Sequence, residues 1–480
     1  MGYGRSVIYT NHAEITDDNV VEVLKEAYKE HLNNRADIVK LWEYYRGKTS
    51  ILQKTKEVRE NINHKICENR AYAIANFYNG YTFGEPVKYI RRENAKKSSD
   101  SDDELAEDIN ALNGYMSDAN KPSCDKELAE RLHACGTSYR LTLPNTDWSE
   151  DGDEPPFNVY ALDPENTFVV YHSGFSKKPL MGVSYVSRDD NTILYSVYTK
   201  NKYYEINSDD KIEKIQSHIL GTIPIIEYPA ETARLGVFEI VIPLLDAINE
   251  LQSNRLDDVV QFVNSFLALL GGEMNEETYA RLEEYKMLCL PEGVDAKYLS
   301  SPMGQSDIQT LKDDLWQSAL EICGIPNRNG GSSTSDTGSA VIMRDGWQDA
   351  EARAKGTELS FKKSEKLFLK LVLRILRDTV GTKLKLTDIE PHFTRRNYEN
   401  IASKSQVLIA MLNSEKIHPE LAFAHCGMFA DPESAYLQSE AWLKEKQKEA
   451  EKEMQAYVNS LGEDDGESVQ NSRQSDSVPA

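Results

Sequence analysis

Between two strongly helical segments lies the stretch Asn329-Gly-Gly-Ser-Ser-Thr-Ser-Asp-Thr-Gly-Ser-Ala340. Glycine imposes no side chain, and Ser and Thr carry only short hydroxyls. Such a composition is typical of backbone that moves or that touches a smooth surface. By itself it favours a plain Gly/Ser linker. The segments on either side are needed to choose between the two interpretations.

A long helix is predicted before this stretch and another after it. Residues 237–269 place apolar side chains at helical spacing, and residues 307–323 repeat the pattern. Pro243 marks a kink in the first helix or the first turn of its continuous part. Residues 340–380 contain no proline, so a helix of roughly 60 Å is possible there. The acidic residues whose spacing puts them near one face of the first helix are Glu239, Asp246, Glu250 and Asp257.

Short β-type runs fill the section from residue 139 to residue 228. They are rich in Val, Ile, Tyr and Thr and are bounded by Asp, Asn, Gly and Pro, which predicts the sheet of an α+β domain. Helices are predicted before this section, including residues 16–32, 37–45 and 61–79. The last residues are polar and acidic, which is typical of disorder.

The overall charge limits the classes of protein to which the chain can belong. It has 78 acidic and 55 basic side chains in 480 residues, for a net charge of -23. This balance argues against tight nucleic-acid binding through a basic patch, but it leaves a weak sliding contact open. The six cysteines form no Cys-x-x-Cys pair, which favours reduced thiols. We expect no signal peptide and no membrane span.

Motifs for catalysis or metal binding are incomplete. The glycines near residue 330 lack the lysine of a phosphate-binding loop. The run from Asp147 imitates a calcium loop, but Asn158 stands where that loop needs Glu. His418, His425 and Cys426 form either a metal cluster or packing residues of a small helical domain, and nearby aromatic residues favour packing. We predict no catalytic residue, no metal and no cofactor, and an enzyme would need a site assembled from scattered residues.

Several local motifs resemble one known family when they are taken in their order along the chain. Together they cover about residues 41–440, and they are Tyr44-Tyr-Arg-Gly-Lys48, Gly80-Tyr-Thr-Phe-Gly-Glu-Pro86, Ile223-Pro-Ile-Ile-Glu-Tyr-Pro229, Gly236-Val-Phe-Glu239, Leu245-Asp-Ala-Ile-Asn249, Ser253-Asn-Arg-Leu-Asp-Asp258, Phe393-Thr-Arg-Arg-Asn397 and Asp431-Pro-Glu-Ser434. The chain resembles the portal proteins of tailed bacteriophages, of the siphovirus type that infects Gram-positive bacteria.

The resemblance implies a portal fold: an α+β wing, a two-helix stem, a small α/β clip, a long tunnel helix and a helical crown. The implied segments are the wing at 1–236, the first stem helix at 237–269, the clip at 270–306, the second stem helix at 307–326, the tunnel loop at 327–340, the long helix with a return strand at 341–399, the crown at 400–456 and a disordered acidic tail at 457–480.

The resemblance also implies a ring at one capsid vertex, typically of twelve subunits, through which double-stranded DNA passes. Its expected partners are the terminase large subunit, the head-tail adaptor, the scaffold protein and the major capsid protein. We expect it in the host cytoplasm during assembly and then in the virion, with no membrane contact. The residues implied to contact DNA are Arg328, Asn329, Gly330, Gly331, Ser332, Ser333, Thr334, Ser335 and Arg344.

Two questions remain open from the sequence. The acidic residues on the first long helix either line the channel, where they would lower friction on DNA, or form an ordinary solvated face. The rival class is an internal scaffold or minor capsid protein without a channel. That class would share the acidity and the long helices, but it has no need for a Gly/Ser loop between two of them.

Overall fold

The structure is a computed structural model that describes residues 3–57, 60–92, 102–149, 152, 154–189, 192–263, 266–270, 295–299, 305–327, 347–394, 401–414, 416–429 and 432–471. The chain forms two compact units, Met1–Arg396 and Asn397–Ala480. The first unit combines sheets with helices, which confirms the α+β class.

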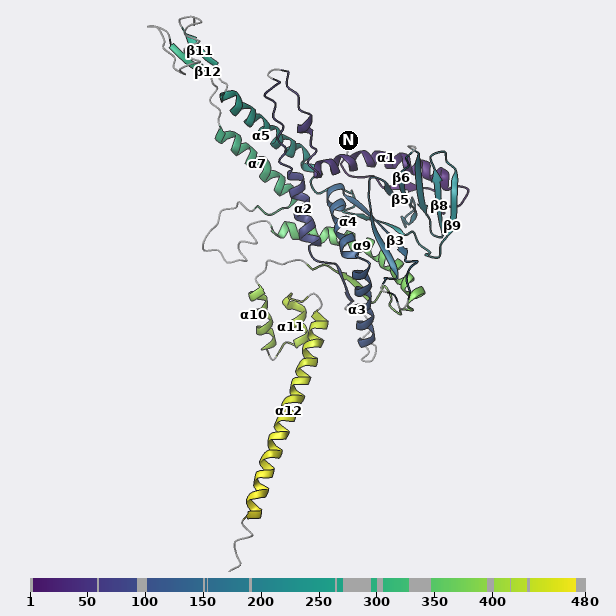
Figure 1. The fold of residues 1–480 in the computed structure, drawn as a ribbon, viewed down its shortest axis with the longest axis vertical. Helices are drawn as coiled ribbons and strands as arrows, with labels where there is room; N and C mark the ends of the chain where they lie inside the picture. The colour runs from purple at the N-terminus through teal and green to yellow at the C-terminus, as the bar shows by residue number, and fades with distance from the viewer. Residues whose placement is uncertain are drawn as a thin grey trace, which may run out of the picture. The chain divides into compact units, whose positions relative to one another are not determined.

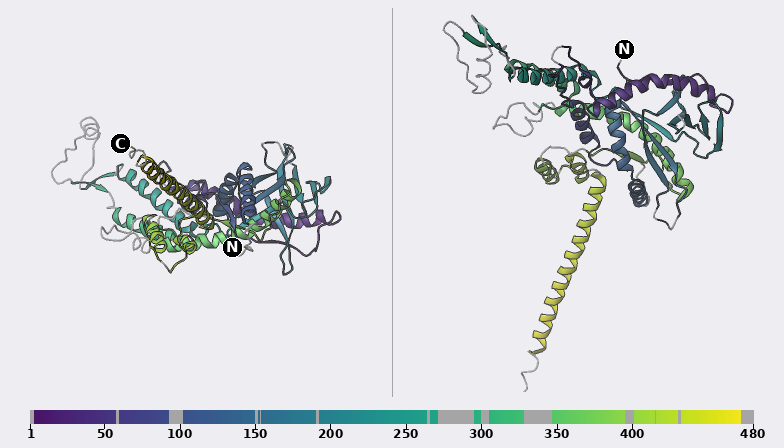
Figure 2. Two further views of the ribbon diagram at one scale, coloured as in Figure 1. Left: turned by 90° about the horizontal axis from the view of Figure 1, so that it is seen from below. Right: turned by 45° about the horizontal axis from the view of Figure 1, so that its top comes forward.

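The larger sheet of the first unit has six strands in the order β1-β5-β6-β7-β8-β9, and helix α1 (Val20–Tyr45) covers one of its faces (Figures 1 and 2). Val20, Val23 and Leu24 of α1 pack against Val170 and Val183 of the sheet. β1 pairs in parallel with β5, and the other neighbours are antiparallel. The strands are β1 (Ile8–Thr10), β5 (Thr167–His172), β6 (Pro179–Ser187), β7 (Ile193–Tyr198), β8 (Lys202–Asn207) and β9 (Ile212–Ser217).

The β section at residues 139–228 was predicted to form one sheet, but its strands are divided between two sheets. A second sheet has the order β10-β3-β4, with β3 (Thr137–Pro144), β4 (Phe157–Leu162) and β10 (Ile225–Pro229). A third pairs β2 (Lys88–Arg91) with β13 (Ile389–His392), so a strand lies within the segment for which a return strand was predicted, but it joins neither of the larger sheets. Strands β1 and β9 were not predicted from the sequence. β9 is exposed at nearly every position, so it lacks the alternating apolar pattern that marks a half-buried strand.

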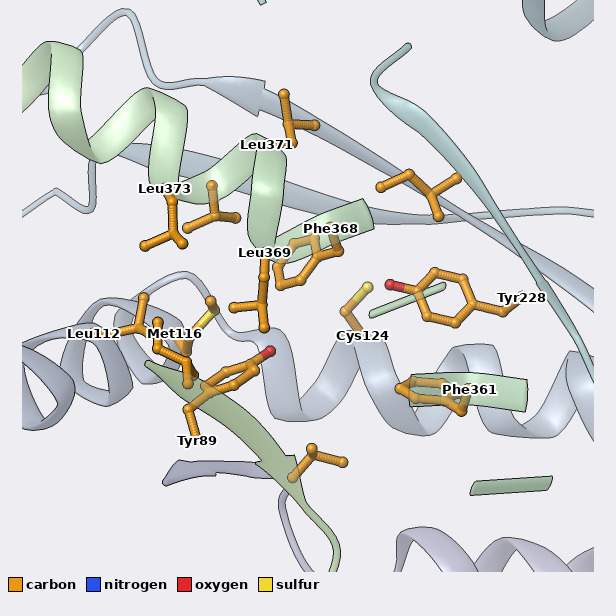
Figure 3. Packing of buried hydrophobic residues seen from close by; sticks show 14 of the residues in the cluster. Tyr89, Leu112, Met116, Cys124, Tyr228, Phe361, Phe368, Leu369, Leu371 and Leu373 are labelled. Carbon is orange, nitrogen blue, oxygen red and sulfur yellow. The ribbon is translucent and has the colours of Figure 1, made fainter. Parts of the chain in front are cut away.

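Helix α9 (Trp347–Thr379) runs through the main hydrophobic core of this unit. Its Phe361, Phe368 and Leu369 are at most 1% exposed and face Tyr89 of β2 and Tyr228 of β10 (Figure 3). Helices α3 (Asp102–Asp118) and α4 (Lys121–Cys135) complete this core. Residues 340–346 of the predicted long helix lie outside the described residues.

Four charged side chains form a closed ion network inside this core. Arg140 of β3 binds Glu365 of α9 at 3.0 Å and also binds Asp125 of α4. Lys121 of α4 binds Glu365 at 3.0 Å and Asp125 at 2.5 Å. Burial opposes the charged form of Glu365, but the charges of Lys121 and Arg140 outweigh it and lower the pKa of Glu365 to about 2. The network therefore fixes α9 against α4 and β3.

Three predicted helix boundaries were wrong. The segments at 16–32 and 37–45 are one helix, α1. The helix predicted at 61–79 begins only at Arg70, as α2 (Arg70–Phe83). The first long helix is α5 (Ile242–Val263), which follows a short 3-10 turn (η2, Glu239–Val241) and is followed by β11 (Phe266–Leu270). Pro243 therefore lies in the first turn of α5, where its missing amide costs nothing.

The second unit is helical, with α10 (Ile401–Leu412), α11 (Pro419–Cys426) and α12 (Pro432–Asn471). Because α12 continues to Asn471, the prediction of a disordered tail from residue 457 was wrong for residues 457–471. His418 caps α11, since its Nδ1 accepts a hydrogen bond from the Glu420 amide at 3.3 Å. Cys426 is buried beside Phe423. Among the described residues no cluster of His, Cys, Asp and Glu could hold a metal ion, and no helix there could cross a membrane.

Candidate functional site

Helices α5 and α7 (Gln305–Cys323) lie side by side (Figure 1). We call them the stem pair. Arg255 of α5 donates from Nη1 to Gln309 Oε1 of α7 at 2.8 Å. At the other end of the pair, Leu245 of α5 and Ala319 and Cys323 of α7 join one buried cluster. The pair is therefore bonded by polar groups at one end and by apolar packing at the other.

The chain from residue 63 to residue 69 is extended and lies along α5, and together with residues 54–57 we call it the strap. Its amides at His64, Ile66 and Glu68 donate to Asp257 Oδ1, Ser253 Oγ and Asn249 Oδ1, at 2.8, 2.9 and 3.0 Å in that order. Four residues of helix rise about 6 Å, and two residues of extended chain cover about 6.6 Å. Because these two distances are nearly equal, every second amide of the strap meets every fourth side chain of α5. The side-chain oxygens of α5 therefore accept the hydrogen bonds that the backbone of a neighbouring strand would accept in a sheet.

Asp257 is the strongest attachment of the strap. Its side chain is fully buried and pairs with Lys54 at 3.5 Å, with Lys56, and with His64 Nδ1 at 2.7 Å. Burial alone would raise the pKa of Asp257, but hydrogen bonds from Lys56 and His64 outweigh burial and lower the pKa to about 2. The carboxylate is therefore ionised throughout the neutral range.

The strap also reaches the second helix of the stem pair. Lys312 of α7 pairs with Glu68 at 2.6 Å, and Glu68 pairs with Arg70 at 2.6 Å. The Arg70 guanidinium lies 4.3 Å from the centre of the Trp316 ring on α7, a favourable cation–π distance. One segment of chain therefore fastens both stem helices to the body of the first unit.

The acidic residues of the first long helix do not form one exposed face. Glu239 is 6% exposed, binds Arg5, and accepts hydrogen bonds from the amides of Gly4 and Gly236 at 2.9 Å each. Asp257 is 0% exposed. A buried carboxylate lines no channel, so that prediction was wrong for these two residues.

The other two acidic residues have different surroundings. Asp246 is half-buried and accepts hydrogen bonds from the Tyr44 hydroxyl at 3.0 and 3.1 Å. Glu250 is exposed. Channel lining remains a prediction for these two alone. The spacing of seven and four residues on α5 therefore marks contacts within the chain as much as it marks a free surface.

The predicted DNA-contacting residues lie outside the described residues: Arg328, Asn329, Gly330, Gly331, Ser332, Ser333, Thr334, Ser335 and Arg344. Most of the predicted clip, 270–306, also lies outside them. Strand β11 pairs antiparallel with β12 (Asp295–Leu299), so the helical assignment of residues 266–269 was wrong.

The fold and the site together define a structural protein in which an α+β body carries a clamped pair of helices. A model of one family, described as "Phage portal protein, SPP1 Gp6-like", matches residues 24–452. The chain belongs to this family of phage portal proteins, and portal function, the conduction of DNA, follows from that membership.

Other similarities add little. No curated protein matches the chain. Among solved structures, a chain in "Neck of empty GTA particle computed with C6 symmetry" is similar over 75% of this chain and 90% of its own length, at 12% identity and a TM-score of 0.44. A resemblance this distant carries no argument about the function of the chain.

Proposed function

We propose that the chain assembles into a closed ring of twelve subunits, the number typical of portal proteins, at one vertex of the capsid. Family membership over residues 24–452 is the observation that carries the proposal. In this ring the stem pair and segment 327–340 border a central channel. Double-stranded DNA enters through that channel during packaging and leaves through it during ejection.

The charge of the chain suits a conduit that does not grip its cargo. A channel that neutralised many phosphates would hold DNA through counterion release, and the packaging motor would have to overcome that attraction at each step. The net charge of -23 disfavours such a grip. Segment 329–340 contains no Lys or Arg, so it would touch DNA through backbone and hydroxyl groups. Arg328 and Arg344 are the cations at its margins in the sequence.

The proposed partners follow the segments of the chain. Residues 270–306 would face the terminase large subunit during packaging and the head-tail adaptor afterwards, and scaffold and major capsid protein would surround the ring. We place assembly in the host cytoplasm and the finished ring in the virion. The proposed role is mechanical, with no catalytic residue and no cofactor.

Electron microscopy of the purified protein tests the ring. We expect class averages that show a ring with a central hole and a fixed number of subunits. A chain that stays monomeric even with scaffold and capsid protein present would contradict the proposal and would favour a non-channel capsid component.

The assignment of the loop has its own test. Replacing residues 330–335 with a shorter rigid linker should leave ring formation intact but reduce DNA packaging or retention. The matched control replaces the six polar residues 96–101 in the same way and should package normally. Normal packaging by the 330–335 variant would refute the loop assignment while leaving the ring untouched.

A further inference from the structure

The C-terminal end of α7 is held by donors from two other helices. The last carbonyl groups of a helix lack partners inside the helix. Here the Tyr78 hydroxyl of α2 lies 2.6 Å from the Cys323 carbonyl oxygen and 3.1 Å from that of Gly324. Arg353 of α9 donates from Nη1 to the Ile322 carbonyl at 3.1 Å. Tyr78 is 1% exposed, so its hydrogen bond to the Cys323 carbonyl is shielded from water, whereas the bond from Arg353 is exposed.

The N-terminal end of α9 is held by the same helix, α2. The Trp347 ring lies 6.1 Å from the Phe77 ring and 5.9 Å from the Tyr81 ring, measured between centroids. Phe77 and Tyr81 stack on each other at 5.7 Å with an interplanar angle of 10°. The Tyr81 hydroxyl donates to Glu351 Oε2 at 2.8 Å. Aromatic packing and one charge-assisted hydrogen bond therefore fix the first turn of α9.

These contacts come from about one turn of α2. Phe77 and Tyr81 are four residues apart, a rise of about 6 Å, and Tyr78 lies between them in the sequence. The described chain stops at Asn327 and resumes at Trp347, so the flanks of segment 328–346 are both held on this turn.

We propose that α2 is the positioning element for segment 328–346, with Tyr78 and Arg353 holding the end of α7 and Phe77 and Tyr81 holding the start of α9. This inference rests on the proposed function only for what the segment does. A sideways load on the segment would be transferred to α2 instead of separating α7 from α9. Because α2 follows the strap directly after Asn69, the load would also reach the strap and the stem pair that it holds.

Tyr78→Phe is the sharpest test, because it keeps the ring and removes one hydroxyl that faces two carbonyls. A neutral hydrogen bond contributes about 1.4 kcal/mol or less, so local opening should rise up to about tenfold. We expect amide hydrogen exchange at Gly324 and Ile325 to speed up by about that factor. Tyr81→Phe should speed exchange at the amides of residues 351–354, which are the first of α9 that can donate within the helix. Tyr72→Phe is the matched control, since it lies on the same helix with a ring that is 45% exposed, and it should change neither end.

A functional readout separates positioning from simple packing. Particles that carry the Tyr78→Phe/Tyr81→Phe double variant should retain less DNA than Tyr72→Phe particles, with ring formation unchanged. Unchanged exchange at both ends would overturn the inference, and so would faster exchange with normal DNA retention. Arg353→Gln removes a different donor from the same cap, so it provides the same test if Tyr78→Phe fails to fold. A wild-type chain that forms no ring would count against the proposed function and not against the role of α2 as the positioning element.

Discussion

Helices α9 and α5 belong to the same unit, yet they are attached in opposite ways. α9 buries large apolar side chains such as Phe361 and Phe368 and places Glu365 in a closed ion network. The middle of α5 and its C-terminal part are attached through Asn249, Ser253 and Asp257, which accept hydrogen bonds from amides of the strap. Apolar burial is the larger stabilising effect, while each hydrogen bond contributes about 1 kcal/mol net.

Helix α9 is therefore part of the hydrophobic core, whereas the strap is a local attachment of α5 to that core. Removing a group beneath α9 should weaken the whole first unit, because that helix is part of its core. Loosening the strap should open one segment while the core remains folded. This arrangement suits a chain in which the stem pair is held firmly but by separable contacts.

The largest effect is expected from Glu365→Gln. It leaves Lys121 and Arg140 buried with one carboxylate between them, and breaking a buried ion pair from one side costs about 3–5 kcal/mol. We expect the urea midpoint of the first unit to fall accordingly. Glu440→Gln, in the exposed α12 pair with Lys444 at 2.9 Å, should cost less than about 1 kcal/mol. Equal effects of Glu365→Gln and Glu440→Gln would show that the buried ion network beneath α9 contributes no more to stability than an exposed ion pair.

An acid titration should weaken the body of the first unit before the strap. Burial lowers the pKa of His31 to about 4 and that of His133 to about 3. The unfolded chain therefore takes up these protons near pH 6.5 and the folded chain does not. The contribution of the two neutral histidines to the free energy of unfolding is complete above pH 6.5. It falls as the pH drops toward 4, by up to about 1.4 kcal/mol per pH unit for each histidine.

Asp257 responds in a lower range of pH. Its pKa is lowered to about 2, so its contribution is present above about pH 4 and is lost as the pH falls toward 2. Melting temperatures from pH 7 to 4 check the order, with His31→Phe expected to show a shallower decline than the wild type. Equal declines in the melting temperatures of His31→Phe and the wild type would contradict the role of His31. Faster exchange of the strap amides at pH 5, before the melting temperature falls, would show that the strap weakens before the body of the first unit.

The smallest global effect is expected from Asp257→Asn. It removes the charge that Lys54 and Lys56 share, so exchange at the His64 and Ile66 amides should rise about 10-fold or more, for a local cost of about 1–3 kcal/mol. The urea midpoint of the core should barely move. Asp258→Asn changes the adjacent carboxylate as a control and should leave the strap protected. A large fall in the midpoint for Asp257→Asn would show that the strap belongs to the core.

Local patterns in the sequence were sufficient for much of this protein. Strand propensity located β3 to β8 and β10, helical spacing located α7 and most of α9, and the order of short motifs indicated the portal family. These features depend on neighbours within a few residues, so they are visible in one dimension. Glycine and proline positions also indicated the turns that separate them.

Only the tertiary structure decided which polar residues are exposed. Asp257 meets His64 across 193 positions of sequence, and Tyr78 meets Cys323 across 245. No local pattern encodes such contacts, so the strap looked like a helix and the buried acids looked like a solvated stripe. The sequence determined most of the helices and strands, and the folded chain determined which of their polar groups are used to hold it together.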